Sequence, residues 1–477
     1  MSDRPLYLTS TLPYVNADPH VGFALELVQA DATVRWNKLQ GREVFFNTGT
    51  DEHGQKIYEA AKKAGQDVQA YADEYAAKFR LLKDKLGLEK GLHFIRTTDA
   101  HHIEAAQELW KRCDAAGDIE KRTYKGLYCV GDEAFMKESD LVEGRCPNHP
   151  NMKLQELEEE NYFFKLSNYQ NKLIAYLSRE GVIVPEWRRQ EAINFVQKGL
   201  EDFSISRVKE KMPWGIAVPG DDTQVMYVWF DALTNYISTL GWPTEAGDFA
   251  TFWQGGEVMQ MAGKDQVRFQ SIIWQAMLMS GGVKNTDQVF YHGFITSGGQ
   301  KMSKSLGNVI EPMAIAAEYG IDALRYFLLR HIHPFEDSDF TMERFKELYN
   351  ANLANGLGNL TSRVLTLAEK NLPGPVAVEF VPYPKEFTDA LAAYKFNDAF
   401  DYIFTRVQAL DQSITHKEPF KVVKDDPEAG KAMIEEMVKE LAAIDLMLEP
   451  FMPGTSKIII EAIMANKKPE NLFARKD

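Results

Sequence analysis

Residues 6–39 read LYLTSTLPYVNADPHVGFALELVQADATVRWNKL, and this stretch decides the fold. Leu6–Ser10 is a short apolar run that predicts a strand, and the prolines, Asn16 and Gly22 that follow predict a turn. Apolar residues at helical spacing then predict a helix over Ala24–Leu39. A strand that passes through a turn directly into a helix is the first half of a βαβ unit.

Strand and helix patterns keep alternating up to residue 115. Further strands are expected at Glu43–Asn47 and Phe94–Thr97, with helices over Gln55–Ala64, Val68–Leu86 and Ala100–Ala115. The alternation breaks after residue 116 and resumes after residue 223, where strands at Val225–Phe230 and Val289–Thr296 and helices over Ala232–Leu240 and Asp265–Ser280 are expected. This order predicts an α/β fold with a doubly wound, Rossmann-like parallel sheet.

The chain has 477 residues, too many for a single hydrophobic core. From about residue 342 the pattern becomes almost entirely helical, with proline-bearing loops between the helices. Five segments are therefore predicted: 1–116, the first half of the α/β domain; 117–223, an inserted connective domain; 224–300, the second half; 301–341, a loop with connecting helices; and 342–477, a helical domain.

Composition places the chain among ordinary globular proteins. It is 45% hydrophobic and 26% charged, which excludes a disordered or fibrous protein. No apolar run reaches membrane-spanning length, residues 1–12 do not resemble a signal peptide, and three cysteines are too few for a disulfide framework. A soluble, cytoplasmic protein without membrane contact is expected. The net charge of −15 excludes general attraction to phosphates, so any nucleic-acid role must rest on a local site.

The turn after the first strand is the first candidate for chemistry. It contains Pro19-His20-Val21-Gly22 at the start of a helix, where free backbone N–H groups and the helix dipole favour an anion. His20 could donate a hydrogen bond to a phosphate, and Gly22 would let a flat ring approach the backbone. A turn with an incidental histidine is the alternative.

The second candidate is the glycine-flanked loop at residues 297–308, which reads SGGQKMSKSLGN. Lys301 and Lys304 lie three residues apart in it, and lysine is a compact cation suited to phosphates. A solvated basic loop is the alternative.

Both stretches carry a family resemblance. Pro19–Gly22 together with Lys301–Ser305 (KMSKS) resembles the two signatures of class I aminoacyl-tRNA synthetases. Five further segments narrow the resemblance to the methionyl-tRNA synthetases: Leu12–Asn16 (LPYVN), Thr48–Gly54 (TGTDEHG), Val228–Ala232 (VWFDA), Gly263–Asp265 (GKD) and Asn359–Arg363 (NLTSR). The resemblance covers essentially the whole chain with the motifs in order.

The resemblance implies a catalytic α/β domain and an anticodon-binding bundle, with L-methionine, ATP accompanied by Mg²⁺, and tRNA(Met) as partners. It implies catalysis by His20, Lys301 and Lys304 through alignment and charge stabilisation. ATP would contact Pro19, His20, Gly22, Lys301, Met302, Ser303, Lys304 and Ser305. Methionine would be held by Leu12, Tyr14, Asp51, Trp229, Ala232, Tyr236 and Phe269, with Asp51 on the α-ammonium group and aromatic walls around the thioether.

Three positions depart from the family pattern. Phe23 stands where the first signature usually has a second histidine, and Gln270 also stands where histidine is usual. Gln266 replaces an apolar residue. Because glutamine can both donate and accept hydrogen bonds, an active enzyme with altered pocket polarity is expected.

Cys129, Asp132, Cys146 and His149 have the paired two-residue gaps of a tetrahedral zinc site. The family often has cysteine at the position of Asp132, and a site with one carboxylate is weaker. Zinc binding and a degenerate knuckle without metal both remain open. Cys113 is expected to be a core residue.

In the helical domain, the resemblance implies that Asn359, Arg363 and Phe420 contact anticodon bases. Asn359 and Arg363 are four residues apart and share one helix face, and an aromatic ring such as that of Phe420 can stack on a base. Phe420 replaces the usual tryptophan. The chain ends soon after this domain, so a monomer is expected.

Two rival interpretations remain. One is another class I synthetase, although the insertion looks too short for the editing domain of the isoleucine, valine or leucine enzymes, and the cysteine enzyme would need zinc ligands in the catalytic domain. The other is a catalytically silent paralogue that binds tRNA or signals methionine. Phe23, Gln266 and Gln270 favour the silent paralogue, and the complete KMSKS loop opposes it.

Overall fold

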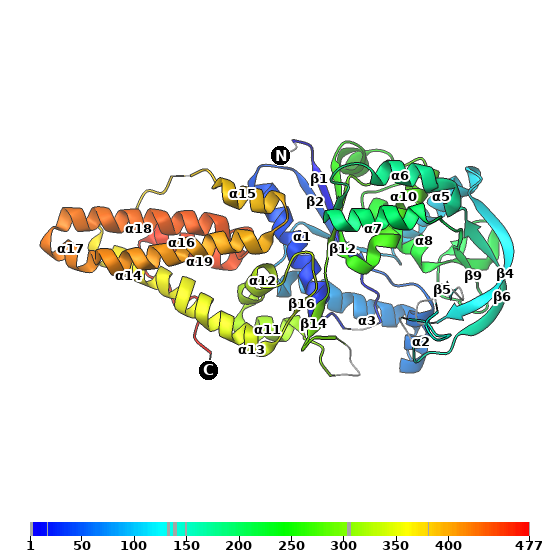
Figure 1. Ribbon diagram of the computed structural model, residues 1–477, viewed down its shortest axis with the longest axis horizontal. Helices are drawn as coiled ribbons and strands as arrows, with labels where there is room; N and C mark the ends of the chain where they lie inside the picture. The colour runs from blue at the N-terminus through cyan, green and yellow to red at the C-terminus, as the bar shows by residue number, and fades with distance from the viewer. Residues whose placement is uncertain are drawn as a thin grey trace. The chain divides into compact units, whose positions relative to one another are not determined.

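The structure is a computed structural model that describes residues 3–16, 18–130, 134–136, 141–147, 150–302, 307–379 and 381–476 (Figure 1). The chain forms two compact units, each built from separate stretches of sequence. The first comprises Met1–Asp18, Phe45–Arg80 and His93–Tyr291. The second comprises Pro19–Val44, Leu81–Leu92 and His292–Asp477.

The main sheet of the first unit has six strands in the order β3-β2-β1-β12-β13-β7. Their bounds are β1 Leu6–Thr9, β2 Val44–Thr50, β3 Leu92–Arg96, β7 Ile183–Val184, β12 Glu257–Gly263 and β13 Gln288–His292. β1 runs parallel to β12, and β13 runs parallel to β7. Figure 1 shows β1, β2 and β12 side by side. The parallel, Rossmann-like sheet predicted from the sequence is confirmed.

Two strands in the second half of the α/β domain differ from the sequence prediction. The predicted strand Val225–Phe230 is wrong, because β11 (Asp221–Met226) joins an antiparallel sheet with β9 (Ser206–Val208) and β10 (Ala217–Val218), and helix α8 starts at Val228. The strand β12, next to β1, was not predicted at all. It is almost entirely buried, and a fully buried strand lacks the alternation that marks half-exposed ones.

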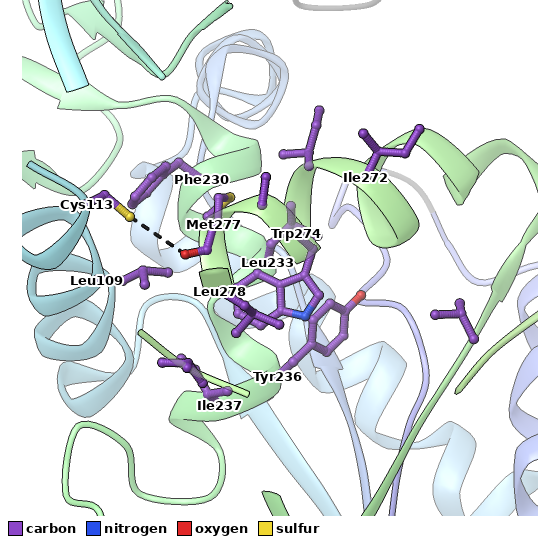
Figure 2. Close-up of a cluster of buried hydrophobic side chains, with 14 of the residues drawn as sticks. Leu109, Cys113, Phe230, Leu233, Tyr236, Ile237, Ile272, Trp274, Met277 and Leu278 are labelled. Atoms are coloured by element: carbon purple, nitrogen blue, oxygen red, sulfur yellow. Dashed lines mark hydrogen bonds between the residues drawn. The ribbon is translucent and has the colours of Figure 1, made fainter. Parts of the chain in front are cut away.

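The helices of the first unit are α2 Gln55–Ala64, α3 Val68–Arg80, α5 Ala100–Ala115, α6 Gln170–Leu177, α7 Glu186–Gln197, α8 Val228–Leu233, α9 Asn235–Ser238 and α10 Trp274–Ser280. Apolar side chains of α5, α6, α7, α8, α9 and α10 form one large core with the sheet. Figure 2 shows part of it, where Leu109 and Cys113 of α5 face Met277 and Leu278 of α10. The Cys113 thiol donates to the Met277 carbonyl, and burial raises its pKa to about 12, which confirms Cys113 as a core residue.

The segment predicted as an insertion contains a long antiparallel ribbon of β4 (Ile119–Cys129) and β6 (Gln155–Phe164), extended by β5 (Ala134–Met136) and β8 (Phe203–Ser204). The same segment also contains β7, which lies at the edge of the main sheet, and α7, which the sequence pattern did not predict. The division of the chain into five domains remains a prediction.

The second unit contains α1 Val21–Leu39, α4 Leu82–Lys85, α11 Pro312–Tyr319 and α12 Ile321–Arg330, together with a small sheet of β15 (Gln300–Lys301), β14 (Ile295–Ser297) and β16 (Ser338–Asp339). Its C-terminal part is helical, as predicted: α13 Met342–Leu348, a π-helical segment Tyr349–Gly358, α14 Asn359–Asn371, α15 Lys385–Ala392, α16 Phe396–Lys417, α17 Pro419–Asp425, α18 Pro427–Leu448 and α19 Pro453–Ala465. In Figure 1, α14, α16, α18 and α19 run alongside one another, drawn from yellow to red.

Among the residues that the structure describes, no helix combines the length and apolar character needed to cross a bilayer.

Candidate active site

The candidate amino-acid pocket lies at the carboxyl ends of β1 and β2. Tyr14 and Asp51 form a parallel bridge, in which the Val15 N–H donates to the Asp51 carbonyl at 3.2 Å and the Asp51 N–H donates to the Pro13 carbonyl at 3.0 Å. Tyr14 and Asp51, 37 positions apart in sequence, therefore meet at the edge of the sheet where ligands of open parallel sheets bind. Asp51 is buried, whereas Leu12 and Tyr14 are half-buried.

The other residues expected to hold methionine lie in the same unit, on α8, on α9 and in the segment after β12. The rings of Trp229 and Phe269 are stacked, with centroids 3.7 Å apart and planes at 16°. Both are half-buried, whereas Ala232 and Tyr236 are buried. The Tyr236 ring meets Trp274 edge-on at 5.7 Å, and Figure 2 shows the two rings beside each other. Aromatic surface of this kind suits a flexible thioether.

Phe269 and Gln270 start a π-helical segment, Phe269–Ile273, which leads into α10. The Gln270 side chain is 1% exposed and donates from Nε2 to the Tyr236 hydroxyl at 2.8 Å. Gln270 therefore holds the polar end of Tyr236. The expected change in pocket polarity remains a prediction. Gln266 instead donates to the neighbouring Asp265 carboxylate and is half-buried.

The candidate phosphate-binding turn lies in the second unit and differs from expectation. The N–H groups at the start of α1 are not free: Val21 donates to the Ile310 carbonyl at 3.1 Å, and Phe23 and Ala24 donate to the His20 carbonyl. The Gly22 N–H donates to His20 Nδ1 at 3.1 Å. The predicted anion site made of free backbone N–H groups is therefore wrong, because His20 itself caps the helix.

The cap determines which ring nitrogen of His20 carries the proton. Since Nδ1 accepts from Gly22, the neutral imidazole has its proton on Nε2, which is left to donate to a ligand. Partial desolvation lowers the pKa of His20 below its ordinary value of 6.5 and favours this neutral form. Any donation by His20 to a phosphate would therefore come from Nε2, and this role remains a prediction.

A side chain at the position of Gly22 would meet the imidazole ring of His20. A Cβ at this position would lie 2.9 Å from Cε1 and 3.0 Å from Nδ1 of the His20 ring, closer than real side chains approach. The same point lies 4.0 Å from Cε of Met302. Gly22 and Met302, which are 280 positions apart in sequence, therefore lie near each other within the second unit. The side chains of His20 and Met302 both lie next to Gly22.

Lys301 is the last residue of β15, where its backbone pairs with Thr296 of β14. The turn between these strands consists of Gly298 and Gly299, whose φ angles are +62° and +74°, a conformation that glycine adopts without strain. Asp339 of β16 accepts from the Gly299 N–H and from the Thr296 hydroxyl, each at 2.8 Å. Ser303, Lys304 and Ser305 lie outside the described residues, so their expected roles remain predictions.

One part of the first unit was missed by the sequence analysis. Asp231, on α8 between Trp229 and Ala232, lies between the imidazoles of His53 and His102. Both Asp231 and His53 fall inside motifs that carry the family resemblance. Asp231 is the one charged residue of the otherwise apolar VWFDA motif, and this could have marked it in the sequence.

The zinc ligands are only partly described. Cys129, at the end of β4, and Cys146 are buried, whereas Asp132 and His149 lie outside the described residues. In the part of the chain that the structure describes, no group of three or more metal-ligating side chains occurs. Zinc binding remains a prediction.

The expected anticodon contacts lie on the helical part of the second unit. Asn359 is the exposed first residue of α14, and Phe420 is 42% exposed on α17. Arg363 forms an ion pair with Asp411 of α16 and donates to Thr415 at 3.4 Å. Arg363 is therefore more constrained than a solvated helix residue.

Comparison with known proteins agrees with this geometry. The model of the family "tRNA synthetases class I (M)" matches residues 6–156 and 150–365. The methionine–tRNA ligase of Mesorhizobium japonicum is 38% identical over 98% of this chain and 93% of its own length. That of Mycobacterium tuberculosis is 44% identical over 82% of this chain and 74% of its own length.

Solved structures give the same picture. The Mycobacterium tuberculosis methionyl-tRNA synthetase in complex with methionyl-adenylate matches with a TM-score of 0.88 and 37% identity, over 96% of this chain and 93% of that one. The free form of the enzyme matches with a TM-score of 0.82 and 32% identity, over 100% and 99% of the two chains. The chain belongs to the class I tRNA synthetases and, within them, to the methionine–tRNA ligases.

Proposed function

We propose that this chain activates L-methionine with ATP and transfers the methionyl group to the 3′ end of tRNA(Met). The observation that carries the proposal is similarity along almost the whole chain to methionine–tRNA ligases, including a structure solved with methionyl-adenylate. The paired signatures around His20 and Met302 and the aromatic pair of Trp229 and Phe269 support it.

The proposed reaction has two steps. A methionine carboxylate oxygen attacks the α-phosphorus of ATP, an O–P bond forms, and the bond to the leaving pyrophosphate breaks. A hydroxyl of the terminal tRNA ribose then attacks the activated carbonyl, and AMP leaves. Neither step requires a nucleophile from the protein, so the protein acts by aligning the reactants and stabilising charge.

Each group of residues has a proposed part in the first step. Asp51 would hold the α-ammonium group by charge, while Trp229, Phe269 and Tyr236 enclose the thioether side chain. His20 would donate from Nε2 to a phosphate oxygen, and Lys301 and Lys304 would neutralise charge on the departing pyrophosphate. Mg²⁺ would enter with the nucleotide and share its charge.

The tRNA would be recognised by the helical domain, where we propose base contacts for Asn359, Arg363 and Phe420. Arg363 is held by Asp411, so it presents its guanidinium in a defined direction. The cytoplasmic location and the monomeric state remain predictions from the sequence. Zinc at Cys129, Asp132, Cys146 and His149 is a separate proposal, and metal analysis of the purified protein distinguishes it from a metal-free knuckle.

Amino-acid-dependent exchange of pyrophosphate into ATP, assayed with all twenty amino acids, tests the function. Exchange with methionine well above that with every other amino acid is expected, with leakage only to close analogues because apolar pockets discriminate by about 1–3 kcal/mol per methylene. Exchange with cysteine or another amino acid would instead identify a different synthetase. No exchange together with intact tRNA binding would identify a silent paralogue.

A further inference from the structure

A buried network of two histidines and one aspartate lies beside the candidate amino-acid pocket. Asp231 is fully buried, its Oδ2 lies 2.7 Å from Nδ1 of His53, and its Oδ1 lies 2.8 Å from Nε2 of His102. His102 is also fully buried, and its Nδ1 lies 2.9 Å from the Ser238 hydroxyl. The three ionisable side chains come from separate parts of the chain: the segment after β2, α5 and α8.

Hydrogen-bond chemistry determines the direction of these contacts. A carboxylate can only accept, so each imidazole must present an N–H to Asp231. Burial would raise the pKa of Asp231, but the charge and hydrogen bonds of His53 and His102 outweigh it and hold the pKa below its ordinary value of 3.8. The buried aspartate is therefore ionised, and each oxygen is occupied by one histidine.

The segment that carries His53 is itself firmly held. Glu52 accepts two hydrogen bonds from the Arg96 guanidinium at 2.7 Å each, and its backbone N–H donates to the Thr97 hydroxyl. The Trp214 indole N–H donates to the Glu52 carbonyl, and the Gly54 N–H donates to the Trp214 carbonyl. Hydrogen bonds thus hold the backbone on both sides of His53. A shift of Asp231 would therefore displace the His53 side chain or break its hydrogen bond to Asp231.

The network joins the two walls of the candidate pocket. Asp51 lies two residues before His53, and Trp229 and Ala232 flank Asp231 on α8. Resting on the proposed function, we propose that Asp231 is a positioning residue for methionine: by accepting from His53 and His102, its carboxylate sets the aromatic wall of α8 at the correct distance from Asp51. Neither histidine nor Asp231 needs to touch the substrate for this role.

The isosteric change Asp231→Asn tests the proposal most directly. An asparagine amide has one acceptor oxygen and one NH₂ group, so it can accept from only one imidazole, and the other imidazole must move its proton to its second ring nitrogen to accept from the NH₂. The shape of the side chain is retained, but the negative charge that holds both imidazole N–H groups is lost. The methionine dissociation constant is measured by calorimetry without ATP, together with the KM values for methionine and ATP in pyrophosphate exchange.

Asp118→Asn is the matched control. Asp118 is also a buried carboxylate of the first unit, and it accepts from the hydroxyls of Tyr169 and Ser280, which are not among the residues proposed to hold methionine. Its loss removes buried hydrogen bonds without affecting the walls of the pocket. Should Asp231→Asn fail to fold, His102→Leu and His102→Gln replace it, since glutamine retains an N–H donor for Asp231 and leucine does not.

For Asp231→Asn, the methionine dissociation constant and the KM for methionine are expected to rise about tenfold or more, while the KM for ATP changes less than about twofold. Asp118→Asn should leave both methionine values within about twofold of the wild type. His102→Leu should behave like Asp231→Asn, and His102→Gln should restore most of the affinity.

An unchanged methionine dissociation constant in Asp231→Asn, or equal losses in Asp231→Asn and Asp118→Asn, would overturn the proposal. Failure of the proposed function would look different, because the wild type itself would then show no methionine-dependent exchange.

Discussion

His20 has two separable tasks at the scale of a single residue. Its Nδ1 accepts the Gly22 N–H and caps α1, and its Nε2 is available to donate to a phosphate. Capping contributes to the stability of the fold, and donation to a phosphate contributes to the proposed reaction. A substitution that retains only one of these tasks therefore separates them.

We predict that His20→Asn and His20→Ala differ in stability but not in activity. Asparagine can cap the helix through its side-chain oxygen, so His20→Asn should keep the thermal stability of the wild type, whereas His20→Ala should lose about 1 kcal/mol. Both variants lack the Nε2 donor, so pyrophosphate exchange should fall about 100-fold or more in each. Thermal unfolding and exchange assays on the same preparations measure the two effects.

The dependence on pH provides the control for this prediction. The pKa of His20 is lowered in the folded protein. The stabilisation by His20 is therefore complete above about pH 6.5, and it is lost as the pH falls below that value and His20 becomes protonated. The stability of the wild type relative to His20→Asn should therefore decrease on acidification. A difference that stays constant between pH 8 and pH 5 would argue against a lowered pKa of His20 in the folded protein.

Gly22→Ala is predicted to lower the exchange activity of the protein without unfolding it. The new Cβ would lie 2.9 Å from the His20 ring, so the ring must move and the bond from the Gly22 N–H to Nδ1 is lost. Exchange activity should fall about tenfold or more, with a loss of stability near 1 kcal/mol. Gly374→Ala, where a Cβ meets no atom within 4 Å and no unusual φ is needed, is the control and should be neutral.

At the scale of the element, β14 and β15 form a hairpin whose turn consists of two left-handed glycines, and Lys301 ends β15 just after that turn. Its geometry depends on Asp339, whose side chain accepts from the Gly299 N–H and the Thr296 hydroxyl. Asp339 is thus the tie between β16 and the turn that leads into the KMSKS segment.

Asp339→Ala is predicted to loosen this turn and to lower the turnover number of pyrophosphate exchange about tenfold, since small misplacements of charged groups are costly in catalysis. The KM for methionine should change little, because the proposed pocket lies in the first unit. Steady-state exchange kinetics give both constants. A rise in the KM for methionine with an unchanged turnover number would contradict this assignment.

At the scale of the whole molecule, the second unit is held together by a buried ion pair. Arg325 and Asp31 are both fully buried and lie 2.8 Å apart, and Arg325 also donates to the carbonyls of Phe451, Leu86 and Pro450. The pair therefore connects α1, α12, the turn before α19 and the end of α4. Hydrogen bonds to all of these carbonyls satisfy the guanidinium where water cannot reach.

Arg325→Met should destabilise the second unit by about 3–5 kcal/mol, because it leaves a buried carboxylate and several carbonyls without this partner. Arg406→Met removes a partly exposed ion pair with Glu440 and should cost about 1 kcal/mol or less. Urea denaturation followed by circular dichroism measures both. Equal costs for the two variants would show that the buried network contributes no more than a surface pair.

The net charge of −15 bears on tRNA binding by the molecule as a whole. Binding must rest on local cations, so the affinity for tRNA(Met) should fall roughly tenfold or more between 50 and 200 mM salt. Pyrophosphate exchange in the absence of tRNA should change much less over this range. Filter binding and exchange assays in parallel provide the test, and tRNA binding that is insensitive to salt would refute the prediction.

The sequence by itself determined the class of fold and the family. A short apolar run places β1, and helical periodicity places α1 and the helical bundle, because each of these elements depends mainly on residues close together in the chain. The motifs around His20, Asp51 and Trp229 are likewise local stretches, and they identify the chemistry. The strand β12 escaped prediction because a fully buried strand has no alternation to reveal it.

Only the tertiary structure decided how these local pieces meet. It showed that His20 caps its own helix, that Met302 approaches Gly22, and that Asp231 lies between His53 and His102. In the last two cases the residues that meet are more than a hundred positions apart in sequence. Such contacts depend on the packing of the whole chain, and no local pattern of apolar and polar residues encodes them.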